Sequence, residues 1–308
     1  MAPVRQQLAG AKCRGEPFPP TLLFGPSGVG KTLLAKSLAA EYGTELIWSH
    51  GRESPADIAA KFRSAKANDI VLIDEAHGLK VKAQELLLSV IDDCTVPDFA
   101  DGDKATDGEQ QEAKVKIEPC TVMLATDQPG KLANALHKRM ELQVRLDFYE
   151  VHEIRKIVDR IASDLNILLS PHAANQIASF SRGLPRRAKH HLRRLRRHFH
   201  DAENRKFSKE DVHGYMRDFG IDANGLELED CEYLRHLHAI GTASLNSLAL
   251  RLGVDQACVG RQIEPYLHRL RFIDVGPGGR TLTPLGREWI TRKTLEEPEM
   301  ENKQNGNN

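Results

Sequence analysis

The sequence predicts a parallel α/β domain over residues 1–148, a small all-helical domain over residues 149–220 and a winged-helix domain over residues 221–292. Three observations support this. Short apolar runs alternate with helical patterns in the first half of the chain, which is typical of a parallel sheet. From about Tyr149 onward, strand patterns give way to helical ones. Near the C-terminus, three helical patterns precede two strand patterns joined by a glycine-rich turn, the order found in a winged helix-turn-helix.

The first domain contains five segments with the length and apolar content of buried strands. A helix with one apolar stripe over residues 83–91 is expected between the third and fourth of them. An acidic stretch follows it as far as Glu118, and we expect a surface hairpin with a mobile tip there. The five predicted strands are Thr21–Phe24, Leu46–Trp48, Ile70–Ile73, Thr121–Ala125 and Leu142–Leu146.

The second and third domains are marked by helix start signals. Ser170-Pro171 has the order of a cap followed by a first-turn proline, Leu184-Pro185 opens a strongly basic helix, and Ser208 begins a fourth helix. A linker near residues 221–225 introduces the third domain. Its predicted elements are helices at 228–238, 244–251 and 255–269 and strands at 272–275 and 280–283. Residues 293–308 have too little apolar content to bury and are predicted to be disordered.

Composition excludes several classes of protein. Lys+Arg and Asp+Glu balance at 43 each, so the overall charge indicates neither nucleic acid nor membrane. The five cysteines form no CxxC pair, which favours a reducing compartment over a disulfide framework or a zinc site. No apolar run approaches the roughly 20 residues that span a bilayer. We therefore expect a cytoplasmic protein without a membrane partner.

A complete GxxxxGK[ST] motif follows the first predicted strand and opens a helix, which is the context that supports a P-loop. Its glycines allow backbone N–H groups to surround phosphate oxygens, and the helix N-terminus adds a positive dipole end. We expect the lysine to reach the β- and γ-phosphates of ATP and the threonine hydroxyl to hold Mg²⁺. The motif consists of Gly25, Pro26, Ser27, Gly28, Val29, Gly30, Lys31 and Thr32.

Two acids follow the third predicted strand. Asp74 is expected in the Mg²⁺ shell, and Glu75 is expected to polarise the attacking water as a catalytic residue. A lone acidic pair after a strand is common, but the P-loop upstream favours the functional interpretation. Residues 74–77 have the sequence of a helicase motif that ends in His77. Because no other helicase motif accompanies it, we interpret His77 as a local structural residue.

The order and spacing of several motifs resemble the RuvB family of AAA+ ATPases over roughly residues 15–290. The motifs are Leu23-Phe24-Gly25-Pro26, Ile73-Asp74-Glu75-Ala76-His77, Ala125-Thr126, Leu136-His137-Lys138-Arg139, Arg145-Leu146-Asp147-Phe148-Tyr149, Ser181-Arg182-Gly183-Leu184-Pro185-Arg186 and Ile263-Glu264-Pro265-Tyr266-Leu267. The resemblance implies an AAA+ core, a helical lid and a DNA-binding winged helix. It also implies a ring, expected to be hexameric, that hydrolyses ATP to drive branch migration at Holliday junctions in recombination and repair.

Carried over residue by residue, the resemblance assigns further roles. Arg139 falls at the arginine-finger position, where it would stabilise the charge on the phosphoryl group bound by a neighbouring subunit. Arg186 falls at sensor 2 and Thr126 at sensor 1, and Tyr149 is placed with the nucleotide-binding residues. Arg280 falls in the wing, where the family contacts DNA. Arg261, on the preceding predicted helix, is a further candidate DNA contact.

Two departures from the family pattern leave alternatives open. Asp127 stands where the family has a second threonine, which puts a negative charge near the γ-phosphate. The stretch 94–119 is acidic and polar where the family uses an apolar hairpin to hold a RuvA partner, so a RuvA-type partner is possible and its docking is left open. A nucleotide-dependent switch that binds DNA without translocating is therefore an alternative to the motor. A loader acting on a protein is a third, although the winged helix favours DNA.

Overall fold

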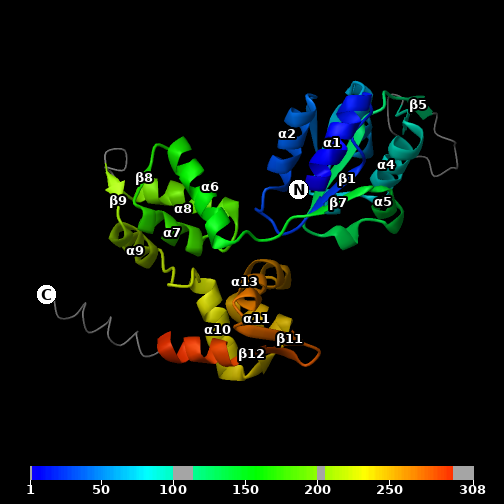
Figure 1. Cartoon of the computed structure of the whole chain (residues 1–308). Helices are drawn as coiled ribbons and strands as arrows, with labels where there is room; N and C mark the ends of the chain where they lie inside the picture. The colour runs from blue at the N-terminus through cyan, green and yellow to red at the C-terminus, as the bar shows by residue number, and fades with distance from the viewer. Residues whose placement is uncertain (1, 100–113, 200–204, 294–308) are drawn as a thin grey trace. The chain divides into compact units, whose positions relative to one another are not determined.

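The computed structural model describes residues 2–99, 114–199 and 205–293, and these fall into two compact units (Figure 1). The first unit comprises residues 1–149 and 184–186, and the second comprises residues 150–183 and 187–308. Residues 294–308 of the predicted disordered tail and the tip of the predicted hairpin lie outside the described residues, whereas Lys293, also predicted to be disordered, is helical. Within the described part of the chain, every helix is too short or too polar to cross a bilayer.

The first unit is built on a parallel five-stranded sheet with strand order β2-β3-β6-β1-β7. All five predicted strands are present with bounds shifted by at most two residues. Strand β1 lies between β6 and β7, and β3 pairs with β6, so the carboxyl ends of β1, β3 and β6 meet at one edge. The strands are β1 (Thr21–Phe24), β2 (Leu46–His50), β3 (Ile70–Asp74), β6 (Thr121–Thr126) and β7 (Leu142–Arg145).

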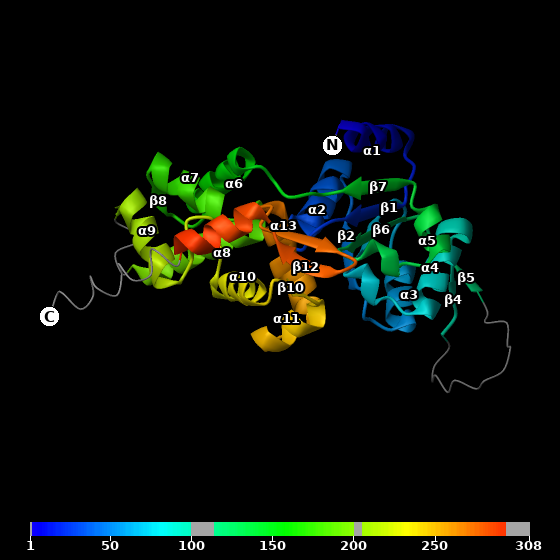
Figure 2. The same ribbon diagram turned by 90° about the horizontal axis from the view of Figure 1, so that it is seen from below.

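Helices cover both faces of this sheet, as Figure 2 shows. Alternate residues along β3 and β6 enter two separate cores, because successive side chains of a strand point to opposite faces. One core packs against α1 (Ala2–Arg14) and α2 (Lys31–Tyr42), and the other packs against α3 (Pro55–Ser64), α4 (Val81–Asp93) and α5 (Asn134–Arg139). Burial on both faces explains why the strands are continuous apolar runs.

The two ends of the acidic stretch after α4 pair with each other as the strands of a hairpin, as predicted. Strand β4 (Thr95–Pro97) pairs antiparallel with β5 (Lys114–Lys116), and Val96 is fully buried against the core of the first unit. The hairpin base is therefore anchored by an apolar contact. Two short 3₁₀ turns, η1 (Ala76–Gly78) and η2 (Pro129–Lys131), follow β3 and β6 at the carboxyl edge of the sheet.

The second unit contains the four predicted lid helices and the winged helix. The lid helices are α6 (Val151–Asp164), α7 (Pro171–Phe180), α8 (Pro185–His198) and α9 (Lys209–Asp218). Serine caps begin α7 and α9 as the sequence indicated, because the Ser170 and Ser208 hydroxyls accept backbone N–H groups. The lid also contains a two-residue parallel pair, β8 (Leu168–Leu169) with β9 (Lys206–Phe207), which the sequence analysis did not predict.

The winged helix differs from its prediction in three details, the last of which is an additional helix over residues 284–293. The predicted helix at 255–269 is a continuous helical run of three parts, α12 (Gln256–Cys258), the π-helical η3 (Val259–Ile263) and α13 (Glu264–Arg269). A third short strand, β10 (Thr242–Ala243), joins β11 (Ile273–Gly276) and β12 (Gly279–Leu282) in the order β10-β12-β11. The other helices are α10 (Leu228–Ile240) and α11 (Leu245–Leu252), and residues 284–293 are also helical.

Candidate active site

The GxxxxGK[ST] segment links β1 to α2 at the carboxyl edge of the sheet. Gly25, Gly28 and Gly30 all have positive φ angles, of 146°, 88° and 105°. At Gly25 a side chain is also excluded by packing, because a Cβ would lie 1.9 Å from the carbonyl oxygen of Leu146. These backbone conformations are costly for other residues. The segment therefore has the glycine-dependent loop geometry that surrounds phosphate groups in nucleotide-binding proteins.

Lys31 is a nearly buried cation in this loop, with 9% of its surface exposed. Its Nζ donates to the carbonyl oxygens of Gly25 at 2.9 Å and Pro26 at 3.1 Å. Burial lowers the pKa of Lys31, and the carboxylates of Asp127, Glu75 and Asp74 oppose that shift. A cation held among carbonyl oxygens and acids at a helix N-terminus fits a polyphosphate, which would replace those partners with stronger anionic ones.

Thr32 and Asp74 form a pair of oxygen groups beside the loop. The Thr32 hydroxyl donates to Oδ2 of Asp74 at 2.8 Å, and the backbone N–H of Glu75 donates to Oδ1 of Asp74 at 3.0 Å. A hydroxyl and a carboxylate next to a phosphate-binding loop are the ligands that Mg²⁺ accepts while it keeps several waters. The donor set at the end of β3 therefore fits Mg²⁺.

Glu75 has a left-handed backbone, with φ of 52°. Such a conformation is uncommon outside glycine and often accompanies function. Gly51, directly after β2, packs against it so closely that a Cβ there would lie 2.2 Å from the Glu75 carbonyl oxygen. The Gly51 N–H also donates to the carbonyl oxygen of Asp74 at 2.8 Å. Gly51 thus sets the backbone position of the expected catalytic glutamate, and the sequence analysis missed it. A glycine directly after a strand was the available signal.

His77 lies among three polar side chains at the carboxyl edge of the sheet. Its Nδ1 is 3.2 Å from Oδ1 of Asp127, 3.4 Å from Oε2 of Glu75 and 3.3 Å from the hydroxyl of fully buried Thr126. The ligand atoms of Glu75, His77 and Asp127 lie within 4.8 Å of one another, a spacing that a divalent cation could bridge. Asp127 therefore faces His77, which offers its carboxylate a partner inside the site.

The first unit also contains both predicted arginines of the hydrolysis site. Nη1 of Arg186 donates to the Ser27 hydroxyl at 3.0 Å, and its backbone N–H donates to the Gly28 carbonyl at 3.2 Å, so this arginine lies against the P-loop. Arg139, at the end of α5, instead makes a two-pronged ion pair with Asp92 of α4 at 3.1 and 3.2 Å. The structure thus brings Arg186 to the loop and leaves Arg139 elsewhere on the same unit.

The remaining predicted residues have different surroundings. Tyr149 is half-buried beyond the end of β7. Arg261, in η3, is exposed, whereas Arg280, in β12, makes an ion pair with Glu264 at 2.8 Å in which both side chains are largely buried. Arg280 therefore contributes to the packing of the wing, and its predicted DNA contact would have to share the guanidinium with Glu264.

Comparison with protein families places three domain models end to end on the chain. The P-loop domain of the Holliday junction DNA helicase RuvB matches residues 3–146, the RuvB AAA lid domain matches residues 149–222, and the RuvB C-terminal winged-helix domain matches residues 223–291. The three matches are consecutive and follow the order of the fold.

Solved structures give the same picture. The Holliday junction branch migration motor RuvB of Thermotoga maritima is 32% identical, with a TM-score of 0.81 over 94% of this chain and 93% of that chain. A lysine-to-arginine variant of it is 32% identical, with a TM-score of 0.81 over 93% and 92% of the two chains. NtrX of Brucella abortus, solved with ADP, is 16% identical with a TM-score of 0.54 over 87% of this chain and 64% of that chain, a likeness of fold alone.

Proposed function

Because the chain belongs to the RuvB family of AAA+ P-loop ATPases, we propose that it is an ATP-driven motor that moves along double-stranded DNA and drives branch migration at Holliday junctions. The observation that carries this proposal is the hydrolysis geometry at the end of β3. There the Thr32 hydroxyl meets Asp74 at 2.8 Å and Glu75 follows directly. A protein that only bound nucleotide would not need the second acid. We place this activity in the cytoplasm, in recombination and repair.

The residues of the P-loop and of β3 have distinct tasks in this proposal. Lys31 would exchange its carbonyl partners for the β- and γ-phosphate oxygens of ATP, and Thr32 and Asp74 would hold Mg²⁺. When bound, Mg²⁺ neutralises the charge that develops on those phosphates. Glu75 accepts a hydrogen bond from the attacking water and orients it for in-line attack. Thr126 would provide a hydroxyl at the sensor 1 position, and Tyr149 is proposed to contact the nucleotide.

Arg139 is proposed to act on the nucleotide of the next subunit in a homohexameric ring. Its present partner, Asp92, is no obstacle, because both side chains are about two-fifths exposed. Ion pairs with such exposure contribute only about 0–1 kcal/mol. An arginine that reaches a transferring phosphoryl group in trans typically accelerates hydrolysis by about 10³–10⁵. Breaking the surface pair therefore costs far less than the finger contributes.

We propose that DNA contacts come from the winged helix. Arg261 is exposed on η3, where it could meet a phosphate, whereas Arg280, on the central strand of the wing, would meet DNA while it retains Glu264. A partner of the RuvA type is proposed to bind the hairpin of β4 and β5, through polar contacts in place of apolar ones. The lysines at both ends of β5 give this hairpin basic as well as acidic groups.

The main experiment measures ATP hydrolysis without DNA, with duplex DNA and with a four-way junction. We expect DNA to stimulate turnover and Glu75→Gln to abolish it while nucleotide binding is retained. Arg139→Ala should abolish turnover in the pure variant, and mixing it with wild-type subunits should inhibit more than in proportion, because the proposed ring hydrolyses ATP at its sites in turn and one disabled site stalls the others. Turnover that falls only in proportion to the Arg139→Ala fraction would contradict the ring mechanism.

The second candidate function is a nucleotide-dependent switch, which Asp127 favours because it puts a carboxylate beside the hydrolysis site. Nucleotide and DNA binding without turnover in the same assay would support the switch and overturn the motor. A loader would be indicated by turnover that responds to a protein partner and ignores DNA. Junction migration measured with a fluorescent four-way substrate separates the motor from both.

A further inference from the structure

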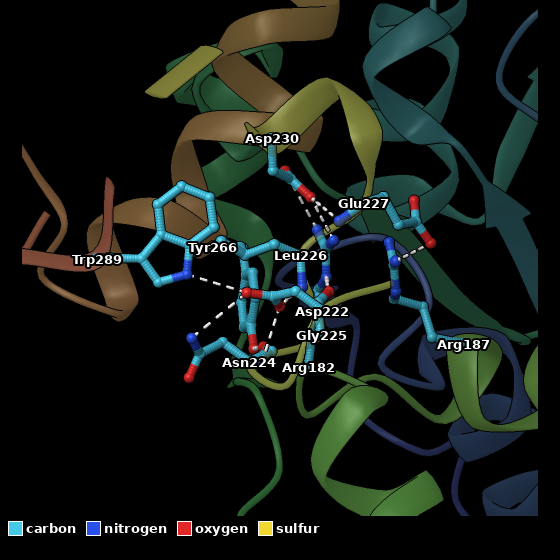
Figure 3. A network of polar contacts seen from close by, with 10 residues as sticks. All are labelled: Arg182, Arg187, Asp222, Asn224, Gly225, Leu226, Glu227, Asp230, Tyr266 and Trp289. Carbon is cyan, nitrogen blue, oxygen red and sulfur yellow. Dashed lines mark hydrogen bonds and ion pairs between the residues drawn. The ribbon is translucent and has the colours of Figure 1, made fainter. Parts of the chain in front are cut away.

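A buried ion pair joins the lid to the winged helix within the second unit. Arg182, between α7 and α8, makes a two-pronged contact with Asp230 in the first turn of α10, and both side chains are only 4% exposed (Figure 3). Breaking a buried pair by removing one partner typically costs about 3–5 kcal/mol, because the remaining charge is left without compensation. The pair therefore resists separation of the two domains.

Arg182 makes further contacts at the junction between the lid and the winged helix, which we call the joint and which comprises Arg182, Asp230 and residues 222–227. Its Nε donates to the Gly225 carbonyl at 2.8 Å, and its guanidinium lies 4.4 Å from the ring centre of Tyr266 in α13. The Tyr266 hydroxyl donates to the carbonyl of Asn224 at 2.6 Å. The left-handed backbone of Arg182, with φ of 55°, directs the side chain into this cluster. One arginine of the lid thus holds the connecting segment and a helix of the winged domain.

The connecting segment itself is a closed turn and not a free linker. The Asp222 carboxylate accepts the backbone N–H groups of Asn224 at 2.8 Å and Leu226 at 2.7 Å, and it also accepts Nε1 of Trp289 at 2.9 Å. Gly225 packs directly on the lid, where a Cβ would lie 3.1 Å from the Cα of Phe180. Asp222, Gly225 and Leu226 are buried, and a segment anchored in this way by internal hydrogen bonds does not act as a hinge.

Arg187 follows Arg186 in the chain and belongs to the second unit. Its guanidinium makes an ion pair with Glu227, the cap residue of α10, while the adjacent residue Arg186 contacts Ser27 of the P-loop. Consecutive residues of a helix point in directions about 100° apart, so one helical turn can contact two different partners. Burial is the largest effect on the pKa of Arg187 and lowers it, and the neighbouring Arg182 lowers it further. Glu227 is therefore its main compensating anion.

We propose that Arg182 and Arg187 are positioning residues that hold the lid and the winged helix together as one rigid body. A movement of α8 caused by the nucleotide would then move the winged helix by the same amount. This inference rests on the proposed function, because it assumes that hydrolysis drives DNA movement. The rigidity of the joint can nevertheless be measured without DNA.

Backbone hydrogen exchange of the full-length protein tests the joint directly. The amides of Asn224, Leu226 and Glu227 are expected to exchange slowly both without nucleotide and with a non-hydrolysable ATP analogue, because each donates to a carboxylate in a buried cluster. Arg187→Gln should speed their exchange. If these amides exchange in the wild type as fast as those of an exposed loop, the two domains are joined by a hinge and the proposal is overturned.

The coupling of ATP hydrolysis to junction migration is tested with Arg187→Gln in the assembled protein. Arg187 is chosen because it is more exposed than Arg182, so its loss is less damaging to folding. We expect ATP turnover to stay within about twofold of the wild type and junction migration per ATP to fall by about tenfold, the size of an ordinary coupling free energy. The matched control is Arg160→Gln, which removes the same charge from an exposed position on α6 and should leave both rates unchanged.

The outcomes separate this inference from the proposed function. If Arg187→Gln migrates junctions normally for each ATP hydrolysed, or loses turnover and migration in equal measure, Arg187 is not a coupling residue and the proposal fails. A wild type that hydrolyses ATP but migrates no junction would overturn the proposed motor, and the amide exchange of residues 224–227 would then decide the rigid joint by itself.

Discussion

Replacing Gly51 with alanine should displace Glu75, the proposed catalytic residue, without touching the P-loop. The added Cβ would lie 2.2 Å from the carbonyl oxygen of Glu75, 2.9 Å from its carbonyl carbon and 3.1 Å from the Cα of Ala76. All three are backbone atoms, so no side chain can rotate away. Because ordinary contacts of this kind begin at 3.4 Å, the two segments must separate by about 1.2 Å.

A displacement of this size has a predictable kinetic effect. A misplacement of about 1 Å at a reacting group can lower the rate by about 10²-fold. We therefore expect Gly51→Ala to lower kcat for ATP hydrolysis by about two orders of magnitude. Lys31 and Thr32 belong to a different segment, so the Kd for a fluorescent ATP analogue should change little. Overpacking should also lower the free energy of unfolding by about 1–3 kcal/mol, so turnover is measured well below Tm.

Two controls make this prediction decisive. Gly130→Ala adds the same methyl group where no atom lies within 4 Å, and it should leave both kcat and Kd unchanged. Glu75→Gln gives the turnover that remains without the catalytic carboxylate, and Gly51→Ala should approach it. A Gly51→Ala protein that is folded and turns over within about twofold of the wild type would refute the reasoning, because the loop would have absorbed the shift without moving Glu75.

Three other predictions concern single groups. Thr32→Val should raise the Mg²⁺ concentration required for half-maximal turnover and leave Mg²⁺-independent nucleotide binding intact, and an unchanged Mg²⁺ dependence would exclude Thr32 as a ligand. Asp127→Thr should tighten ATP binding by about 1 kcal/mol, or roughly fivefold in Kd, and an unchanged Kd would mean that His77 already neutralises the carboxylate. Burial lowers the pKa of His191 to about 3, so the native state excludes a proton that the unfolded chain accepts below its ordinary value of 6.5. The free energy of unfolding should therefore fall as the pH drops from about 6.5 toward 3, and the loss between pH 8 and pH 5 should be about 2 kcal/mol. In His191→Gln, the free energy of unfolding measured by denaturation should change less over this pH range.

Local sequence determined the class of the fold and much of the hydrolysis site. The P-loop, the acids after β3 and the serine caps of α7 and α9 were predictable, because each depends on backbone conformation and hydrogen bonds within a few residues. Apolar periodicity predicted the five core strands, since burial on both faces of a parallel sheet leaves a continuous apolar run. The roles of Arg139, Arg186 and Thr126 were predictable only from the resemblance to a family and stay predictions.

Short pairings escaped the sequence analysis. Strands β8 and β9 have two residues each, which is too few for a periodic pattern, and their partners are 38 residues apart. The same is true of β10, which pairs with β12 from across the winged helix. Such pairs exist because packing of the helices brings the backbones together, and no local preference of Thr242 or Ala243 indicates it.

The tertiary structure alone decided which groups meet. Gly51 against Glu75, Asp92 with Arg139, and Asp222 with Trp289 join residues that are 24 to 67 positions apart. The segment at 221–225 has the composition of a linker, yet burial of Arg182 and Asp230 makes it a fastened joint. Sequence patterns report what each segment favours by itself, whereas a buried charge or a close backbone approach depends on where distant segments pack. The residue types of the proposed hydrolysis site were thus largely determined by local sequence, whereas the contacts that join the lid to the winged helix were determined by the fold.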